Sequence, residues 1–225
     1  VVIVDLDQQA GVRAAAELTA EGGEATFVAA DVTDDAQLAA LIDAATHRGR
    51  LGVLVNNAGG WGATGRQWPD APPVEWSAVL DLNLRVPMLA TQLALPALRR
   101  AGGGAVVHVG SSGGLGPDAY GSPEYGAAKA GLLRFTTALS GLADEGIRVS
   151  CVVPHWIGLP RAQREYEALG LDERRRSGGL VSPEAIAAEV VRLAEDDGVA
   201  GHLVAMRAGR APYLLEPPGI DPHWS

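Results

Sequence analysis

Three side chains that can handle a proton lie in the short segment 110–129, which reads GSSGGLGPDAYGSPEYGAAK. Tyr125 and Lys129 are four residues apart, so on a helix they share one face, one turn apart. An ammonium beside a phenol favours the phenolate, which lets a tyrosine release its proton nearer to neutral pH than its usual pKa of about 10. Ser112 can hold a substrate oxygen in front of that phenol. The set predicts proton transfer to or from an alcohol or carbonyl oxygen, although a Tyr-Lys pair alone also fits the surface of an alanine-rich helix.

The composition argues against several other classes of function. The 225 residues carry a formal net charge of −9, and no Lys/Arg cluster is longer than Arg174–Arg176, which argues against nucleic-acid binding. The single cysteine, Cys151, lies in the apolar run VSCVV and is expected to pack in the core rather than act as a nucleophile. The five histidines lack metal-ligand spacing, so we expect no metal site. No apolar run approaches the roughly 20 residues of a membrane span and no signal peptide is visible, so we expect a cytoplasmic protein that does not bind membranes.

Short apolar stretches alternate with helical patterns along the chain. Strands are predicted at 1–5, 25–31, 51–56, 105–110, 147–154 and 201–206. Helices are predicted at about 10–21, 34–47, 74–100, 122–144 and from 182 onward, and Pro87 should kink the third of these or remove one of its hydrogen bonds. The arginine-rich stretch 155–181 is expected to be irregular. The pattern predicts an α/β fold in which a doubly wound parallel sheet is the middle of three layers.

Polar or special residues follow several of these strands directly. In parallel sheets of this kind, ligands bind outside the carboxyl ends of the strands. The residues found at those positions are Asp5, Asp31, Asn57, Ser112 and Pro154. Their placement predicts a cofactor site around the Tyr-Lys pair.

With these residues assembled, the chain resembles the short-chain dehydrogenase/reductase family of the compact, Rossmann-like type, from Val1 to about Met206. The resemblance is carried by four features taken together, each weak alone: YGAAK at 125–129, Ser112 thirteen residues before Tyr125, NNAG at 56–59, and Asn83 within DLNL. It implies an oxidoreductase that moves a hydride between NAD(H) and a secondary alcohol or ketone.

The resemblance implies a role for each matching residue. Tyr125 is expected to be the catalytic acid/base, with Lys129 lowering its pKa and holding the nicotinamide ribose. Ser112 would bind the substrate oxygen. Asn83 would position a water in the proton relay, or else would satisfy a polar group at the helix kink. The cofactor-binding set comprises Asp5, Asp31, Val32, Asn57, Ala58, Gly59, Tyr125, Lys129, Pro154 and Ile157, with Asp31 and Val32 at the adenine and Ile157 at the nicotinamide amide.

The cofactor is expected to be NAD rather than NADP. Asp5 ends the first visible strand, where a carboxylate accepts hydrogen bonds from the adenosine ribose and repels a 2′-phosphate. Asp7 competes for this role, but it is better placed to begin the next helix.

The chain also departs from the family pattern. The glycine-rich phosphate loop, with its strand and helix, should precede Asp5 and is absent from these residues. With strand order 3-2-1-4-5-6, the missing strand is the central one, so the strands ending at Asp5 and Asn56 would lose their shared neighbour. We therefore expect one truncated NAD(P)-binding domain over 1–225, either a fragment or a chain with a misassigned start.

Further departures follow the fifth strand. The family has Pro-Gly there with a threonine four residues beyond the glycine, whereas this chain has Pro154-His155 and, at the threonine position, Leu159, which offers no hydroxyl. His155 and Trp156 would either line the substrate pocket or pack. The sequence MRAGRAP at 206–212 lacks the usual Asp-Gly-Gly ending.

The remaining expectations concern the lid, the tail and the partners. Residues 155–181 are expected to form a substrate lid, and 207–225 a tail that reaches a neighbouring subunit or stays disordered. A homodimer or homotetramer is expected, assembled through the long Asn83 helix and the Tyr125 helix. The alternative function is an inactive remnant acting through subunit association. A sugar-nucleotide epimerase or dehydratase is less favoured, because too little chain follows Pro154 for a separate substrate domain.

Overall fold

Residues 1–47, 49–61, 66–116 and 121–215 are described by the structure, a computed structural model of the chain. Strands and helices alternate, and the predicted α/β fold is confirmed. The strands are β1 (Val2–Asp5), β2 (Thr26–Ala29), β3 (Val53–Asn56), β4 (Gly104–Val109), β5 (Ile147–Pro154), β6 (Leu203–Met206) and β7 (Tyr213–Leu215). The α-helices are α1 (Gln8–Ala20), α2 (Asp35–His47), α3 (Pro73–Leu80), α4 (Val86–Arg100), α5 (Pro123–Ala138), α6 (Pro160–Ala168), α7 (Leu171–Ser177) and α8 (Pro183–Glu195).

The strands form two separate sheets. β1 and β2 pair in parallel, with Val4 opposite Val28, while the larger sheet has the order β3-β4-β5-β6-β7. Strands β3 to β6 are parallel and β7 runs antiparallel to β6. Within the described ranges β1 and β3 share no ladder. Val53 and Val55 of β3 are 44% and 42% exposed, whereas the valines of β4 are buried.

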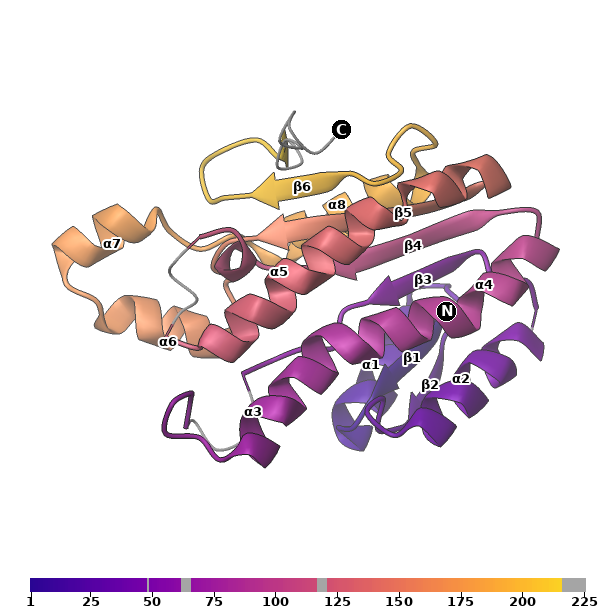
Figure 1. Ribbon diagram of the computed structural model, residues 1–225, viewed down its shortest axis with the longest axis horizontal. Coiled ribbons are helices and arrows are strands. Elements are labelled where there is room, and N and C mark those ends of the chain that lie inside the picture. Colours follow the sequence, from indigo (N-terminus) through magenta and orange to yellow (C-terminus); the bar gives the residue numbers. More distant parts are fainter. Residues whose placement is uncertain (48, 62–65, 117–120, 216–225) are drawn as a thin grey trace, which may run out of the picture.

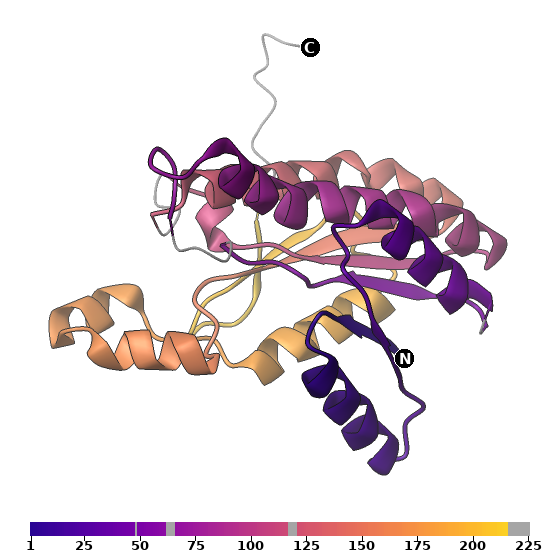
Figure 2. The same cartoon turned by 90° about the horizontal axis from the view of Figure 1, so that it is seen from below.

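Helices cover both faces of the strands and make the three layers (Figure 2). α2, α4 and α5 lie on one face, where Leu98 packs with Val106 and Ile147. α1 and α8 lie on the other, where Leu193 packs with Val107. Figure 1 shows the parallel strands β3 to β6 pointing toward the end of the molecule that carries α6 and α7. Asn57 and Ser112, which follow β3 and β4, and Pro154, which ends β5, therefore lie toward this end.

The predicted long helix 74–100 is interrupted by a wider turn. α3 runs into a π-helical turn, η1 (Asp81–Arg85), and α4 begins directly after it. Pro87 lies in the first turn of α4, where the missing N–H of proline is tolerated. A π turn inside an α-helix is rare and is frequently found at functional sites. The kink expected from Pro87 thus takes the form of a widened turn that contains Asn83.

Three other boundaries differ from the sequence expectations. The predicted helix 122–144 ends at Ala138 and is followed by the 3-10 turn η3 (Ser140–Glu145), which Gly146 closes at φ 71°. The stretch 155–181, expected to be irregular, contains α6 and α7, and the tail contributes β7. The last ten residues, 216–225, lie outside the described part. Among the described helices, none combines the length and apolar character that crossing a bilayer requires.

Candidate active site

Ser112 begins a 3-10 turn, η2 (Ser112–Gly114), directly after β4. The turn is fixed by the Ser111 hydroxyl, which accepts a hydrogen bond of 3.1 Å from the Gly113 N–H. It also lies against α5, because Gly114 has no side chain: a Cβ there would be 2.6 Å from the backbone nitrogen of Ala130. The serine is therefore held at the strand end and against the helix that carries the tyrosine and lysine.

Tyr125 and Lys129 lie in the first two turns of α5, as the spacing predicts. The Lys129 ammonium is 5.7 Å from the centre of the Tyr125 ring. Lys129 is only 4% exposed, and its Nζ donates a 2.9 Å hydrogen bond to the carbonyl of Val109 at the end of β4. A charged group this deeply buried is held at the junction of strand and helix rather than on a surface.

The electrostatics around Lys129 are dominated by burial. Burial lowers the pKa of Lys129 from its usual 10.5 to about 8, while Cys151 acts in the opposite direction. Cys151 is fully buried, which confirms that it is a packed core cysteine, and this burial raises the pKa of its thiol to about 12. His108, beside them in β4, has its pKa lowered to about 4 by burial and, further, by Lys129. The ammonium is therefore the group of this cluster that can change charge closest to neutral pH.

Asn83 is fully buried in the η1 turn, and its amide is engaged by protein atoms. Its Nδ2 donates to the carbonyls of Gly60 at 2.7 Å and Val79 at 2.9 Å, and its Oδ1 accepts from the Gly60 N–H at 3.1 Å. These bonds fasten the loop after β3 to the helix. The backbone carbonyl of Asn83 has lost its α-helical donor, because the residue four positions on is Pro87 and has no N–H.

Gly59 lies between Asn83 and Lys129 and brings them to one point. A Cβ on Gly59 would be 2.9 Å from Asn83 Oδ1, closer than packed atoms allow, and 3.3 Å from Lys129 Nζ, which is a tight contact. Asn83 cannot retreat without losing its bonds to Gly60.

Replacing Gly59 by alanine is expected to lower the free energy of unfolding by about 1–3 kcal/mol, the usual cost of inserting a methyl group into a packed site. Chemical denaturation of wild type and variant measures this difference in the free energy of unfolding. The matched control is Gly60→Ala, because a Cβ on Gly60 meets no atom within 4 Å. Equal stability of the two variants would contradict the close packing at Gly59.

Aromatic rings and arginines connect the tyrosine to the helices that follow β5. Trp61 lies edge to face with Tyr125, with the ring centres 5.9 Å apart. The guanidinium of Arg161, in α6, is 4.7 Å from the centre of the Trp61 ring. A second set joins α6 to its neighbours: Tyr166 contacts Trp156 and the Arg174 guanidinium. The segment 155–181 is thus in contact with the loop after β3 through Trp61.

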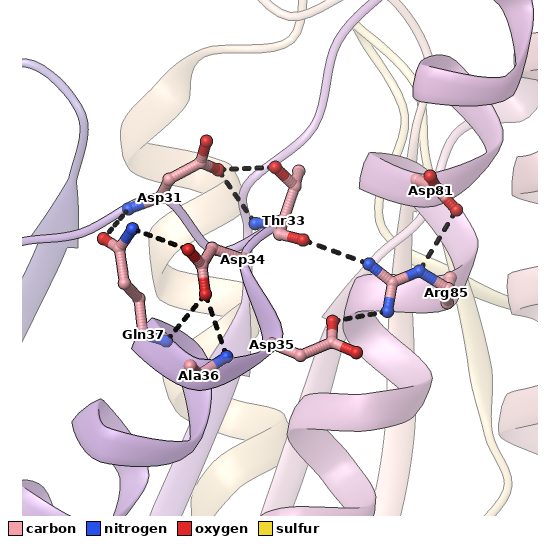
Figure 3. A network of polar contacts seen from close by, with 8 residues as sticks. All are labelled: Asp31, Thr33, Asp34, Asp35, Ala36, Gln37, Asp81 and Arg85. Atoms are coloured by element: carbon pink, nitrogen blue, oxygen red, sulfur yellow. Dashed lines mark hydrogen bonds and ion pairs between the residues drawn. The ribbon is translucent and has the colours of Figure 1, made fainter. Parts of the chain in front are cut away.

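The predicted adenine-binding end is a separate polar network, drawn in Figure 3. Asp31 Oδ1 accepts hydrogen bonds from the N–H and the hydroxyl of Thr33, which fixes the direction of the carboxylate. Arg85, the last residue of η1, joins this loop to that turn. It pairs with Asp35 at 2.6 Å and Asp81 at 3.1 Å, and donates to the Thr33 carbonyl. The loop that carries Asp31 is therefore tied to the same turn that contains Asn83.

The other predicted cofactor residues lie at the strand ends and are accessible. Asn57, Ala58 and Gly59 are exposed after β3, and Asp5 is exposed at the end of β1, where its Oδ1 accepts from the Asp7 N–H. Asp7 caps α1 through a bond from the Ala10 N–H, so the expectation that it begins the helix is confirmed.

Pro154 is buried at the end of β5, and Ile157 pairs with Val181 through a single bridge. In this bridge the Gly158 N–H donates to the Val181 carbonyl, and the Val181 N–H donates to the Trp156 carbonyl. In the part of the chain described, the Ile157 N–H has no acceptor. It can therefore donate to an amide oxygen.

These observations test whether a nicotinamide cofactor fits. A buried ammonium has three hydrogens, and among the described residues Val109 is the one acceptor of Lys129, so ribose hydroxyls would satisfy the rest. The exposed 57–59 loop, the Ile157 N–H and the oriented Asp31 carboxylate fit the nicotinamide and adenine ends. The residues present therefore fit the two ends of the cofactor.

Sequence reasoning missed three contacts. His155 Nδ1 lies 2.9 Å from Ser112 Oγ, Trp61 touches the tyrosine ring, and Arg161 covers Trp61. The signal for the first was present, because His155 directly follows a strand end where the family has glycine. Within the described ranges, no three His, Cys, Asp or Glu side chains gather as metal ligands.

Comparisons with known proteins agree with this geometry. The family model described as short chain dehydrogenase matches residues 1–168. The cyclopentanol dehydrogenase of Comamonas sp. (strain NCIMB 9872) is 34% identical over 75% of this chain and 67% of its own length. The cyclohexanol dehydrogenase of Acinetobacter sp. (strain SE19) is 32% identical over 88% of this chain and 78% of its own. A Burkholderia xenovorans crystal structure, of a short-chain dehydrogenase/reductase candidate, has a TM-score of 0.81 at 27% identity and covers 92% of this chain and 83% of that one.

Proposed function

The chain belongs to the short-chain dehydrogenase/reductase family, whose members act on CH–OH groups with a nicotinamide cofactor, and we propose that it oxidises a secondary alcohol to a ketone with NAD. The observation that carries the proposal is the buried Lys129 ammonium, placed between the Tyr125 ring and the end of β4. Burying a charge lowers the stability of the fold, so a buried charge is often found where it serves a function. In this proposal the Lys129 ammonium favours the Tyr125 phenolate and binds the ribose of the cofactor.

The reaction divides among four residues. Tyr125 takes the hydroxyl proton of the alcohol as the hydride leaves the adjacent carbon. Ser112 donates a hydrogen bond to the same oxygen while its charge develops. Lys129 passes the proton toward a water held by the Asn83 backbone carbonyl. The bound nicotinamide supplies the hydride acceptor.

The substrate class is a compact, apolar ring alcohol. Trp61 presents an aromatic wall beside Tyr125, and Arg161 of α6 lies over that wall. Apolar pockets with few polar groups suit small hydrophobic ligands. Two relatives are named for cyclopentanol and cyclohexanol. In this proposal residues 155–181 form a lid, which closes on the substrate through Arg161 and Trp61.

The test is to offer the protein cyclopentanol, cyclohexanol and an open-chain secondary alcohol, each with NAD and with NADP. The rate of oxidation is measured from the absorbance of the reduced cofactor. Formation of a ketone from the ring alcohols at a rate above that of the open-chain alcohol supports the proposal. No turnover with any alcohol and either cofactor would overturn it. A fluorescence titration with NADH, done on the same preparation, separates failure to bind cofactor from failure of the chemistry.

The preference for NAD is assigned to the Asp5 carboxylate. Asparagine at this position keeps an oxygen for the Asp7 N–H but removes the charge that repels a 2′-phosphate. Asp5→Asn is therefore expected to raise the affinity for NADPH relative to NADH by about tenfold, or about 1.4 kcal/mol. Parallel titrations of the two nucleotides measure the ratio. An unchanged ratio would mean that another residue discriminates.

A second candidate function is a non-catalytic remnant that acts through subunit association. The observation in its favour is the break between β1 and β3: among the described strands, each of the two has one edge without a partner. Unpaired edges are templates for pairing with another chain. Association as a homodimer or homotetramer through α4 and α5 is compatible with either function. Sedimentation of the purified chain, alone and with NADH, distinguishes them: self-association without nucleotide binding would favour the remnant.

A further inference from the structure

His155 contacts the hydroxyl proposed to bind the substrate oxygen. Its Nδ1 lies 2.9 Å from Ser112 Oγ, a normal hydrogen-bond distance, across 43 residues of sequence. The backbone of His155 is fixed, because its main-chain N–H donates to the Met206 carbonyl at the end of β6. Ser112 is fixed too, because its turn lies against α5 at Gly114. The contact therefore joins two rigid strand ends, β4 and β5.

The direction of this hydrogen bond decides what Ser112 can offer a substrate. A serine hydroxyl has one proton and two lone pairs. If His155 Nδ1 accepted that proton, the serine would present lone pairs to the substrate oxygen, which carries lone pairs itself. If Nδ1 carries a proton and donates it, a lone pair of Ser112 is occupied and the hydroxyl proton is not used on His155, so it can be given to the substrate oxygen. A donated bond also polarises the hydroxyl and strengthens the bond that it gives.

We propose that His155 is a positioning residue: it donates a hydrogen bond from Nδ1 to Ser112 Oγ and thereby directs the serine proton to the substrate oxygen. The inference rests on the proposed dehydrogenase function and extends it. The residue lies where the family resemblance expects glycine, so this device belongs to this chain's own sequence. No proton is transferred between His155 and Ser112, since the imidazole N–H and the serine O–H each keep their hydrogen.

The first experiment uses an isosteric pair at position 155. Leucine and asparagine have nearly the same shape, but an asparagine nitrogen can take the place of Nδ1 and donate to Ser112. His155→Leu is expected to lower kcat for alcohol oxidation about tenfold, the size of one lost hydrogen bond to a reacting centre. His155→Asn is expected to stay within about threefold of the wild type. Equal loss in both variants, or loss in neither, would overturn the role.

A double-variant cycle shows whether His155 acts through Ser112. In Ser112→Ala the hydroxyl is gone, so His155→Leu should cost nothing further in that background. Independent, multiplying effects would overturn the inference while leaving the dehydrogenase function intact. Full activity of Ser112→Ala would overturn the proposed function itself, so the two failures are distinguishable.

A direct readout does not need turnover. Nitrogen-15 spectra of the imidazole rings distinguish a protonated Nδ1 from a protonated Nε2. The His155 signal is identified by its absence from His155→Asn. We expect the neutral ring to carry its proton on Nδ1 in the wild type and its Nδ1 signal to shift in Ser112→Ala. A ring protonated on Nε2 alone would overturn the proposal.

Discussion

Replacing Tyr125 by phenylalanine is expected to lower alcohol oxidation about a thousandfold, within the range that positioned acid–base groups contribute. The phenol oxygen is the proposed acceptor of the substrate proton, and in Tyr125→Phe no other group replaces it. The ring itself remains, so its edge contact with Trp61 and its place beside Lys129 are kept. Folding and NADH affinity should therefore change little. Steady-state rates with a ring alcohol, NADH titration and thermal denaturation measure the three quantities.

The control for this variant is Tyr213→Phe, which also removes one phenolic oxygen. Tyr213 lies in β7 and is 46% exposed. Turnover of this control should equal the wild type. If Tyr125→Phe kept more than about a tenth of the wild-type rate, acid–base catalysis by this phenol would be too small for the proposed route.

The parts of the site that the sequence predicts are those set by local spacing or by strand ends. Tyr125 and Lys129 share a face because four residues make about one turn of any helix. Asn57 and Ser112 come to one edge because β3 and β4 are parallel neighbours that end on the same side. Neither inference needs a side-chain contact between distant segments.

The contacts that the sequence does not predict depend on how distant segments pack. His155 reaches Ser112 only because β5 is the neighbour of β4, and Arg161 reaches Trp61 only because α6 folds back over the strand ends. The π turn at Asn83 is a similar case. Pro87 predicts a disturbance, but the widened form of the turn comes with the Asn83 bonds to Gly60 and Val79.

Replacing Lys129 by methionine is expected to have opposite effects on stability and on function. Methionine fills the same buried space without a charge. The pKa of about 8, against 10.5 for a solvated lysine, means that the folded state bears a cost of about 3 kcal/mol at neutral pH. The lost bond to the Val109 carbonyl offsets about 1 kcal/mol of this. We expect Lys129→Met to raise the free energy of unfolding by about 1–2 kcal/mol at pH 7, and to lower turnover at least about a hundredfold.

The stability difference between wild type and Lys129→Met should depend on pH in a defined direction. Below about pH 8 the ammonium is charged in both states, so wild type carries the full cost. Between about pH 8 and 10.5 the folded state is neutral while the unfolded state still holds the proton. Wild-type stability relative to Lys129→Met therefore rises with pH across this window and is constant above it. Urea denaturation of both proteins over this range measures the difference.

Lys129 is the single lysine of the chain, which makes its charge directly observable. Carbon-13 labelling of lysine gives one side-chain signal, and its titration midpoint should fall near 8. Arg134→Met, an exposed position on the same helix, is the control and should leave stability unchanged within about 0.5 kcal/mol. If Lys129→Met were less stable than wild type at pH 7, the buried ammonium would be a structural support rather than a charge held for the reaction. If it were more stable and inactive, the fold bears the cost of Lys129 for the sake of the site.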